Sequence, residues 1–199
     1  MIQIYIKTPG NQYQKFRDLG FGMFIHFQAP REGEFNPGIH TAEKWARIAR
    51  EAGMKSIVLT TKHSHQIPLW ESSFSNRDIT DRTSFKRDLV KELNTACKAN
   101  GLRMGSYYNI GDSAHPLYTD SDTDIVGYVD YLYGMMDELC ELHQPILIWF
   151  DASRRFRDPA GRDYFSPFHI RNAHYGTIPD PRMGAKHLFY FKGRDLISP

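Results

Sequence analysis

Residues 41–61, TAEKWARIAREAGMKSIVLTT, join an amphipathic helix to a buried strand and decide the fold class. In the first part, Trp45, Ile48, Ala49 and Ala52 fall at helical spacing, with Thr41 suited to cap the start and Gly53 to end the helix. The second part, SIVLTT, is a nearly continuous apolar run of the kind found in strands buried on both faces. The stretch therefore predicts a helix over 41–53 that leads into a strand over 56–61.

The same alternation of helix and strand patterns runs through the first two-thirds of the chain. Strands are expected at 21–27 (FGMFIHF), 102–109 (LRMGSYYN) and 145–151 (PILIWFD), and further helices at 84–101 and 124–143. Such an alternation implies right-handed crossovers and a parallel sheet. We therefore predict an α/β fold of the (β/α)8 TIM-barrel type. An open doubly wound sheet shares this alternation, but no Gly-rich phosphate loop follows any predicted strand.

The predicted barrel is partial. A complete (β/α)8 barrel usually needs about 250 residues, and this chain has 199. Residues 1–151 hold about four strand–helix units and are predicted to be the first half of the barrel. Residues 152–199 read as an irregular tail, in which HIRNAHYGTI (169–178) and HLFYFKG (187–193) supply one or two strands that complete the sheet. Because half a barrel exposes two sheet edges, we expect pairing with a second copy or with a missing C-terminal half.

Composition excludes several classes of function. The formal net charge is +2, which gives no electrostatic case for nucleic acid or an anionic membrane as a partner. No apolar run approaches the roughly 18–20 residues that a bilayer requires. The N-terminus, MIQIYIKTPG, is too short and polar for a signal peptide, so we expect a cytoplasmic protein, or an exported one if a leader has been removed. The two cysteines, Cys97 and Cys140, make no disulfide scaffold and suit a reducing compartment.

Polar residues gather just after the predicted strand ends, at His26, Lys62 with His63, Tyr107 to Asn109, and Asp151. Active sites of (β/α)8 barrels are built at that face. Asp151 is therefore a candidate catalytic carboxylate, although a strand-end aspartate also caps the segment that follows. His26 and His63 are suited to hydrogen-bonding sugar hydroxyls, because imidazole both donates and accepts. The alternative for each is a histidine bonded to a neighbouring strand-end carbonyl.

The H-x-H pair of His63 and His65 allows a metal-site interpretation. Side chains at i and i+2 of a strand share a face, and amidohydrolase-like barrels begin a metal site in this way. Such a site needs three or four ligands, which Asp151 and His26 would complete. Against it, the amidohydrolase pair usually lies on the first strand, and Gln66 and Pro68 indicate that the chain has left the strand by His65. We expect neither a metal nor a cofactor.

Four blocks of sequence resemble the retaining α-L-fucosidases of glycoside hydrolase family twenty-nine in order and spacing. They are FGMFIHF (21–27), EKWARIAREAGMKSIVLTTKHSHQIPLW (43–70), KRDLVKELNTACKANGLRMGSYYN (86–109) and ILIWFD (146–151). The resemblance implies that Asp151 is the catalytic nucleophile and that His26 and His63 contact fucose. It places Tyr107 near the nucleophile and matches Trp70 to an aromatic of the motif, for which packing under a loop is the alternative role.

The chain also departs from the family pattern. Ser64 replaces the second histidine of the family's His-His pair, and His65 and Gln66 replace the Asp-Gly that follows. In RNAHYG (171–176), His174 stands where the family has arginine. No glutamate follows Glu141, so the general acid/base cannot be identified. A retaining glycosidase needs two carboxyl groups about 5–5.5 Å apart, and the chain offers one at a predicted strand end.

The sequence thus predicts a glycoside hydrolase similar to the α-L-fucosidases, which would hydrolyse terminal α-L-fucosides on an oligosaccharide or glycoconjugate by a double displacement at Asp151. A second hypothesis is a degenerate barrel fragment that binds fucose or another carbohydrate without turnover. A third is the amidohydrolase-like enzyme that uses His63 and His65.

Overall fold

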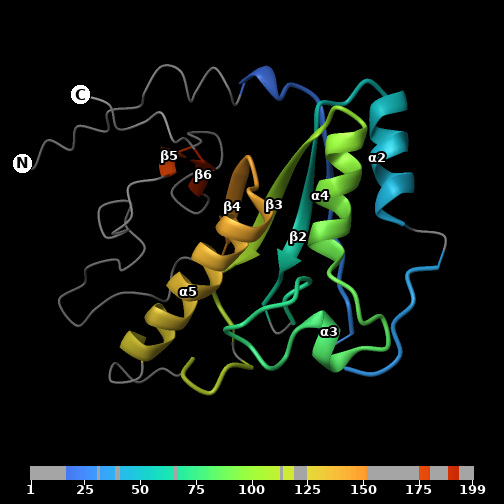
Figure 1. Ribbon diagram of the computed structural model, residues 1–199. Coiled ribbons are helices and arrows are strands. Elements are labelled where there is room, and N and C mark those ends of the chain that lie inside the picture. Colours follow the sequence, from blue (N-terminus) through green and yellow to red (C-terminus); the bar gives the residue numbers. More distant parts are fainter. Residues whose placement is uncertain are drawn as a thin grey trace, which may run out of the picture.

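Six strands form one sheet in the part of the chain that the structure describes. The computed structural model describes residues 17–30, 32–38, 41–64, 67–112, 114–118, 125–151, 175–179 and 188–192. The strands are β1 (Gly22–Ile25), β2 (Ser56–Lys62), β3 (Arg103–Asn109), β4 (Leu147–Asp151), β5 (Tyr175–Pro179) and β6 (Leu188–Lys192). The spatial order is β1-β2-β3-β4-β6-β5 (Figure 1).

The first four strands confirm the predicted α/β alternation. They pair in parallel in chain order, and a helix lies in each connection. The helices are α2 (Ala42–Glu51), α3 (Ile79–Arg82), α4 (Leu89–Ala99) and α5 (Ile125–His143). The short helix α3 lies in the long β2–α4 connection and was not predicted. Among the described residues, no helix has the length and apolar character of a membrane-spanning segment.

The helix boundaries follow from local chemistry. The Thr41 side chain accepts a hydrogen bond from the Lys44 amide, and Gly53 adopts a φ of 73°, so both predicted ends of α2 are confirmed. The predicted start of the next helix at residue 84 was wrong. Lys86 has a φ of 52°, which interrupts the helical backbone, and the Asp88 carboxylate caps the Lys91 amide instead, so α4 begins at Leu89.

The two faces of the sheet carry different side chains. One face, the helix face, packs Ile57, Leu59, Met104, Tyr108 and Ile148 with residues of α2, α4 and α5 in the main core. The other, the open face, carries Val58, Tyr107 and Leu147 in a smaller apolar cluster, with Trp149 packed against it. Figure 1 shows α4 and α5 on one side of the strands. Alternation along each strand separates the two sets.

The last two strands depart from the βα pattern. Strand β6 falls inside the segment 187–193 predicted to form a strand, and β5 overlaps the predicted segment 169–178 but ends one residue beyond it. However, β6 pairs antiparallel with β4, through contacts such as Trp149↔Phe189, and β5 pairs antiparallel with β6. The tail therefore extends the sheet as a two-stranded antiparallel unit and does not continue the parallel barrel. The rest of residues 152–199 lies outside the described residues.

The end of α5 and the start of α4 bury a histidine beside a carboxyl group. His143 is 2% exposed, and its Nε2 lies 3.4 Å from Oδ2 of Asp88. The Asn94 side chain donates to the His143 carbonyl at 2.6 Å and ties the two helices together. Burial lowers the pKa of His143 to about 4 and raises the pKa of Asp88 to about 6.

We expect these two shifts to oppose each other in the pH dependence of stability. Unfolded His143 takes up a proton near pH 6.5 but the folded residue only near pH 4, so about 3 kcal/mol of stabilisation is lost as the pH falls through that window. Folded Asp88 is protonated near pH 6 and unfolded Asp88 near pH 3.8, so its contribution, also about 3 kcal/mol, is lost as the pH rises through pH 6.

The His143→Gln variant should therefore become more stable, by about 1 kcal/mol, when the pH is lowered from 7 to 5. The stability of the wild-type protein should change little over this range, because the contributions of His143 and Asp88 nearly cancel. Urea unfolding at a series of pH values measures both curves. A variant curve that stays as flat as the wild-type curve between pH 7 and pH 5 would contradict the assignment to His143.

Candidate active site

The structure brings together four of the five predicted site residues on the open face. His26 follows β1, His63 follows β2, Tyr107 lies near the end of β3, and Asp151 ends β4. The parallel pairing aligns these carboxyl ends: Thr60 pairs with Tyr107, Tyr107 with Trp149, and Asn109 with Asp151. Residues from four separate strands therefore share one end of the sheet.

A direct hydrogen bond joins Tyr107 and Asp151. The Tyr107 hydroxyl donates to Oδ2 of Asp151 at 2.5 Å. Burial, together with the neighbouring Asp151, raises the pKa of Tyr107. The phenol therefore stays protonated at neutral pH and remains a donor. Its hydrogen bond fixes one oxygen of the Asp151 carboxylate. Asp151 is half-buried and lies at the end of β4 on the open face.

The two histidines surround the same tyrosine. The His63 ring stacks on Tyr107, with centroids 5.7 Å apart and planes 17° apart. The His26 ring lies 5.0 Å from His63 and 6.4 Å from Tyr107. Both imidazoles have a polar neighbour of their own, since Ser64 Oγ lies 3.2 Å from Nδ1 of His63 and Gln28 Nε2 lies 3.1 Å from Nε2 of His26. The cluster combines one carboxylate, one phenol and two imidazoles.

An apolar wall borders this cluster. Phe24 of β1 meets Tyr107 edge-on at 5.8 Å and Trp149 edge-on at 5.3 Å. Phe24 is 41% exposed, so it offers an aromatic surface beside the polar groups. Polar donors next to an aromatic wall are typical of sites that bind small polar ligands.

A one-residue bulge in β2 determines which side chain reaches the open face. Thr60 pairs with Tyr107, but Lys62 pairs with Tyr108, so Thr61 is the extra residue. The Thr61 hydroxyl donates to the Tyr107 carbonyl at 2.9 Å, and the Thr61 carbonyl accepts from the Leu69 amide. Because the bulge shifts the alternation by one residue, Lys62 turns to the helix face and His63 to the open face.

The fifth predicted residue, Trp70, lies apart from the cluster. Its side chain is fully buried in the main core on the helix face. The indole Nε1 donates to Oε2 of Glu138 on α5 at 2.9 Å. Glu138 also accepts bonds from the Ser73 amide and hydroxyl. The structure therefore favours packing under a loop, rather than a sugar contact, as the role of Trp70.

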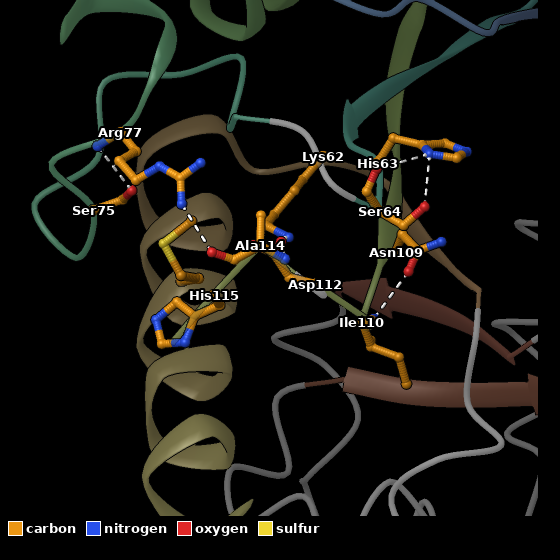
Figure 2. Close-up of polar contacts among 12 residues, drawn as sticks. Lys62, His63, Ser64, Ser75, Arg77, Asn109, Ile110, Asp112, Ala114 and His115 are labelled. Carbon is orange, nitrogen blue, oxygen red and sulfur yellow. Dashed lines mark hydrogen bonds and ion pairs between the residues drawn. The ribbon is translucent and has the colours of Figure 1, made fainter. Parts of the chain in front are cut away.

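Sequence reasoning did not find the partner of Lys62. The ammonium lies 3.2 Å from Oδ2 of Asp112, and the Lys62 side chain is 0% exposed (Figure 2). A lysine at the end of an apolar strand requires a carboxylate when it is buried. That requirement predicts a partner, but several aspartates follow strand ends, and only the folded positions select Asp112.

The metal interpretation finds no geometric support among the residues described here. No three His, Cys, Asp or Glu side chains of these ranges gather in a metal-binding arrangement. His65, the second histidine of the proposed pair, lies outside the described residues. His63 itself already lies past the end of β2, as Gln66 and Pro68 indicated.

Four parallel strands that alternate with helices, with polar side chains gathered at their carboxyl ends, define an α/β protein that is part of a (β/α)8 barrel domain. The family model described as Alpha-L-fucosidase matches residues 29–164, more than half of the chain. The chain therefore belongs to the α-L-fucosidase family, glycoside hydrolase family 29.

Individual relatives agree with this assignment. The Alpha-L-fucosidase of Dictyostelium discoideum is 30% identical over 156 residues, which cover 74% of this chain and 34% of that protein. The Tissue alpha-L-fucosidase of Homo sapiens is 34% identical over 145 residues, covering 71% and 31% respectively.

Solved structures support the fold. Alpha-L-fucosidase isoenzyme 1 from Paenibacillus thiaminolyticus superposes with a TM-score of 0.65 at 29% identity, covering 76% of this chain and 45% of that chain. The GH29 alpha-L-fucosidase of Bacteroides thetaiotaomicron, trapped as a covalent intermediate with 2-fluoro-fucosyl fluoride, superposes with a TM-score of 0.66 at 23% identity. The match covers 76% of this chain and 44% of that chain. The chain spans about a third of the length of the two curated relatives named above, and its fold is part of the family's barrel domain.

Proposed function

We propose that this chain binds the terminal fucose of an α-L-fucoside and attacks its anomeric carbon with Asp151. The observation that carries the proposal is the 2.5 Å hydrogen bond from Tyr107 to Asp151, beside the rings of His26 and His63. One carboxylate oxygen is held in place, and two imidazoles stand nearby to bond sugar hydroxyls. Membership of the α-L-fucosidase family supports fucose as the sugar.

In the proposed first step, an oxygen of Asp151 forms a bond to the anomeric carbon while the bond to the leaving oxygen breaks. The electron pair of the broken bond goes to the leaving group, and the product is a fucosyl ester of Asp151. In the second step, water attacks the same carbon and releases one proton to the solvent, while the bond from that carbon to the Asp151 oxygen breaks and Asp151 is regenerated as a carboxylate. Two inversions give net retention of configuration.

The sequence favours a second candidate, a fucose-binding fragment with little turnover. A natural leaving group needs a proton from a second carboxyl group. No glutamate follows Glu141, and Asp151 is the one carboxylate at the ends of the four parallel strands that the structure describes. Without that acid, binding and attack on activated substrates remain, but hydrolysis of ordinary glycosides is weak.

Two measurements on the purified chain separate these candidates. Titration calorimetry with L-fucose, with D-fucose as the mirror-image control, reports binding. Release of nitrophenol from an aryl α-L-fucoside reports turnover, because this leaving group departs with little protonation. Binding of L-fucose with turnover supports the enzyme, and binding alone supports the fragment. An absence of both would overturn the proposal.

A histidine variant tests whether the open face is the binding surface. We expect His63→Asn to weaken L-fucose binding about 10- to 100-fold, because a lost hydrogen bond in a polar sugar site costs about 1–3 kcal/mol. His115→Asn is the matched control, since His115 stacks on Tyr131 of α5 away from the cluster. Equal affinity in the two variants would exclude His63 as a contact.

A further inference from the structure

Two consecutive side chains at the end of β2 point to opposite sides of the sheet. Figure 2 shows Lys62 directed toward Asp112 and α5, and His63 directed the other way. The bulge at Thr61 produces this division, because Lys62 pairs in register with Tyr108 on the helix face. Whatever holds Lys62 in place therefore also sets the direction in which His63 leaves the strand.

Lys62 is held on the helix face by charge and by an aromatic ring. Its ammonium lies 3.2 Å from Oδ2 of Asp112 and 5.6 Å from the centre of the Tyr108 ring. Burial lowers the pKa of Lys62, and Asp112 opposes that fall. An exposed lysine would move freely on its four-carbon stem, but this one has no room to do so.

Asp112 is itself fixed in the loop that follows β3. Its Oδ1 accepts from the Ala114 amide at 3.1 Å, and its carbonyl accepts from the His115 amide. Arg77 donates to the Ala114 carbonyl at 3.0 Å and so ties this loop to the β2–α4 connection. The Lys62–Asp112 pair therefore links the end of β2 to the loop after β3. His63 directly follows β2, and Tyr107 lies on β3.

Such a pair is poorly explained by stability alone. Buried ion pairs are often no more stable than apolar groups of the same shape, because desolvation offsets their attraction. A role in specifying the pairing register fits better. With the bulge Lys62 faces the helices and His63 the open face, and without the bulge the two side chains would exchange faces. Here one register places an imidazole against Tyr107, and the other would place an ammonium there.

We propose that Lys62, through its ion pair with Asp112, is a positioning residue that directs His63 onto the open face. Lys62 does not touch the sugar; it acts through the backbone of the strand end. The bearing of this inference on sugar binding rests on the proposed function. The geometric part concerns His63 and Tyr107 and is measurable without any ligand.

The test uses the double variant Lys62→Met/Asp112→Asn in the whole chain. Methionine keeps the length of the lysine stem without charge, and asparagine keeps the Oδ1 acceptor for the Ala114 amide. Removing both charges avoids an unpaired buried ion, so the double variant should unfold at a temperature close to that of the wild-type protein. Lys55→Met is the matched control, because Lys55 precedes the same strand but is exposed.

The decisive readout is the NMR signal of the His63 ring, assigned with His63→Gln. Stacking on Tyr107 shifts this signal by the ring current in the wild-type protein. In the double variant we expect the signal to move to the position of an exposed histidine and the L-fucose Kd to rise at least about tenfold. A His63 signal that stays at its wild-type position in the folded double variant would overturn the proposal.

A second variant covers the case in which the double variant does not fold. Asp112→Asn alone leaves Lys62 buried, and the lysine can release its proton, so the fold should persist. The His63 signal should move in this variant as well, and an unmoved signal would again overturn the proposal. If the signal moves while the wild-type protein binds no L-fucose, the positioning role stands and the proposed function fails.

Discussion

The Asp151→Asn variant is expected to form no covalent fucosyl adduct under conditions in which the wild-type protein is fully labelled. The reagent is 2-fluoro-fucosyl fluoride, and the adduct is read by intact-mass analysis. Loss of the attacking oxygen should slow labelling by at least about 10³-fold, or about 4 kcal/mol of transition-state stabilisation.

This reagent suits a chain in which no acid/base is identified. Fluoride leaves without needing a proton, so labelling tests the nucleophile alone. The 2-fluoro group also slows attack by water, so the ester accumulates. Asparagine keeps an Oδ1 acceptor for the Tyr107 hydroxyl, so the variant should retain the local structure.

The control for this experiment is Asp130→Asn, an exposed aspartate on α5 that should label at the wild-type rate. Peptide mapping of the wild-type adduct should place the label on the peptide that contains Asp151. Labelling of Asp151→Asn at an unchanged rate would show that another carboxylate is the nucleophile. In that case mapping would direct attention to the aspartates of residues 152–199.

The Trp70→Ala variant is expected to lose about 3–5 kcal/mol of unfolding free energy. Trp70 is fully buried, so truncation leaves a large cavity in the main core. It also removes the donor to Glu138, whose pKa is lowered because its hydrogen bonds from Ser72, Ser73 and Trp70 together outweigh the raising effect of burial. Urea unfolding followed by circular dichroism measures the loss.

Trp70→Phe separates a packing role from a sugar contact. Phenylalanine keeps most of the apolar volume but lacks the indole N–H, so we expect a loss of about 1–3 kcal/mol and an unchanged L-fucose Kd. Ile48→Ala, on the exposed side of α2, should change stability by less than about 1 kcal/mol. If Trp70→Phe bound L-fucose more weakly at unchanged stability, Trp70 would instead be a sugar-binding residue.

Much of the fold was predictable because its signals are local. Thr41 and Gly53 bound α2 by capping chemistry, and continuous apolar runs marked the four parallel strands. Tyr107 and Asp151 could be placed together because the carboxyl ends of parallel strands share one edge. Strand order placed them at one edge of the sheet, and the family resemblance placed Tyr107 near Asp151.

The remainder depended on contacts that a periodic pattern does not encode. The direction of β6 is set by its pairing with β4, which is remote in sequence. The hydrogen bond of the buried Trp70 indole is made to Glu138, 68 residues away. The start of α4 moved because Lys86 takes a left-handed backbone conformation, which no apolar spacing signals.

The bulge at Thr61 makes the register of β2 as important as the identity of its residues. If β2 paired with β3 without the bulge, Thr61 would stand opposite Tyr108, and every side chain beyond it would change face. Lys62 would then enter the surface that carries Tyr107, and His63 would turn to the helix face. A slip of one residue would thus invert the chemistry of this strand end without substituting any of the side chains that define it.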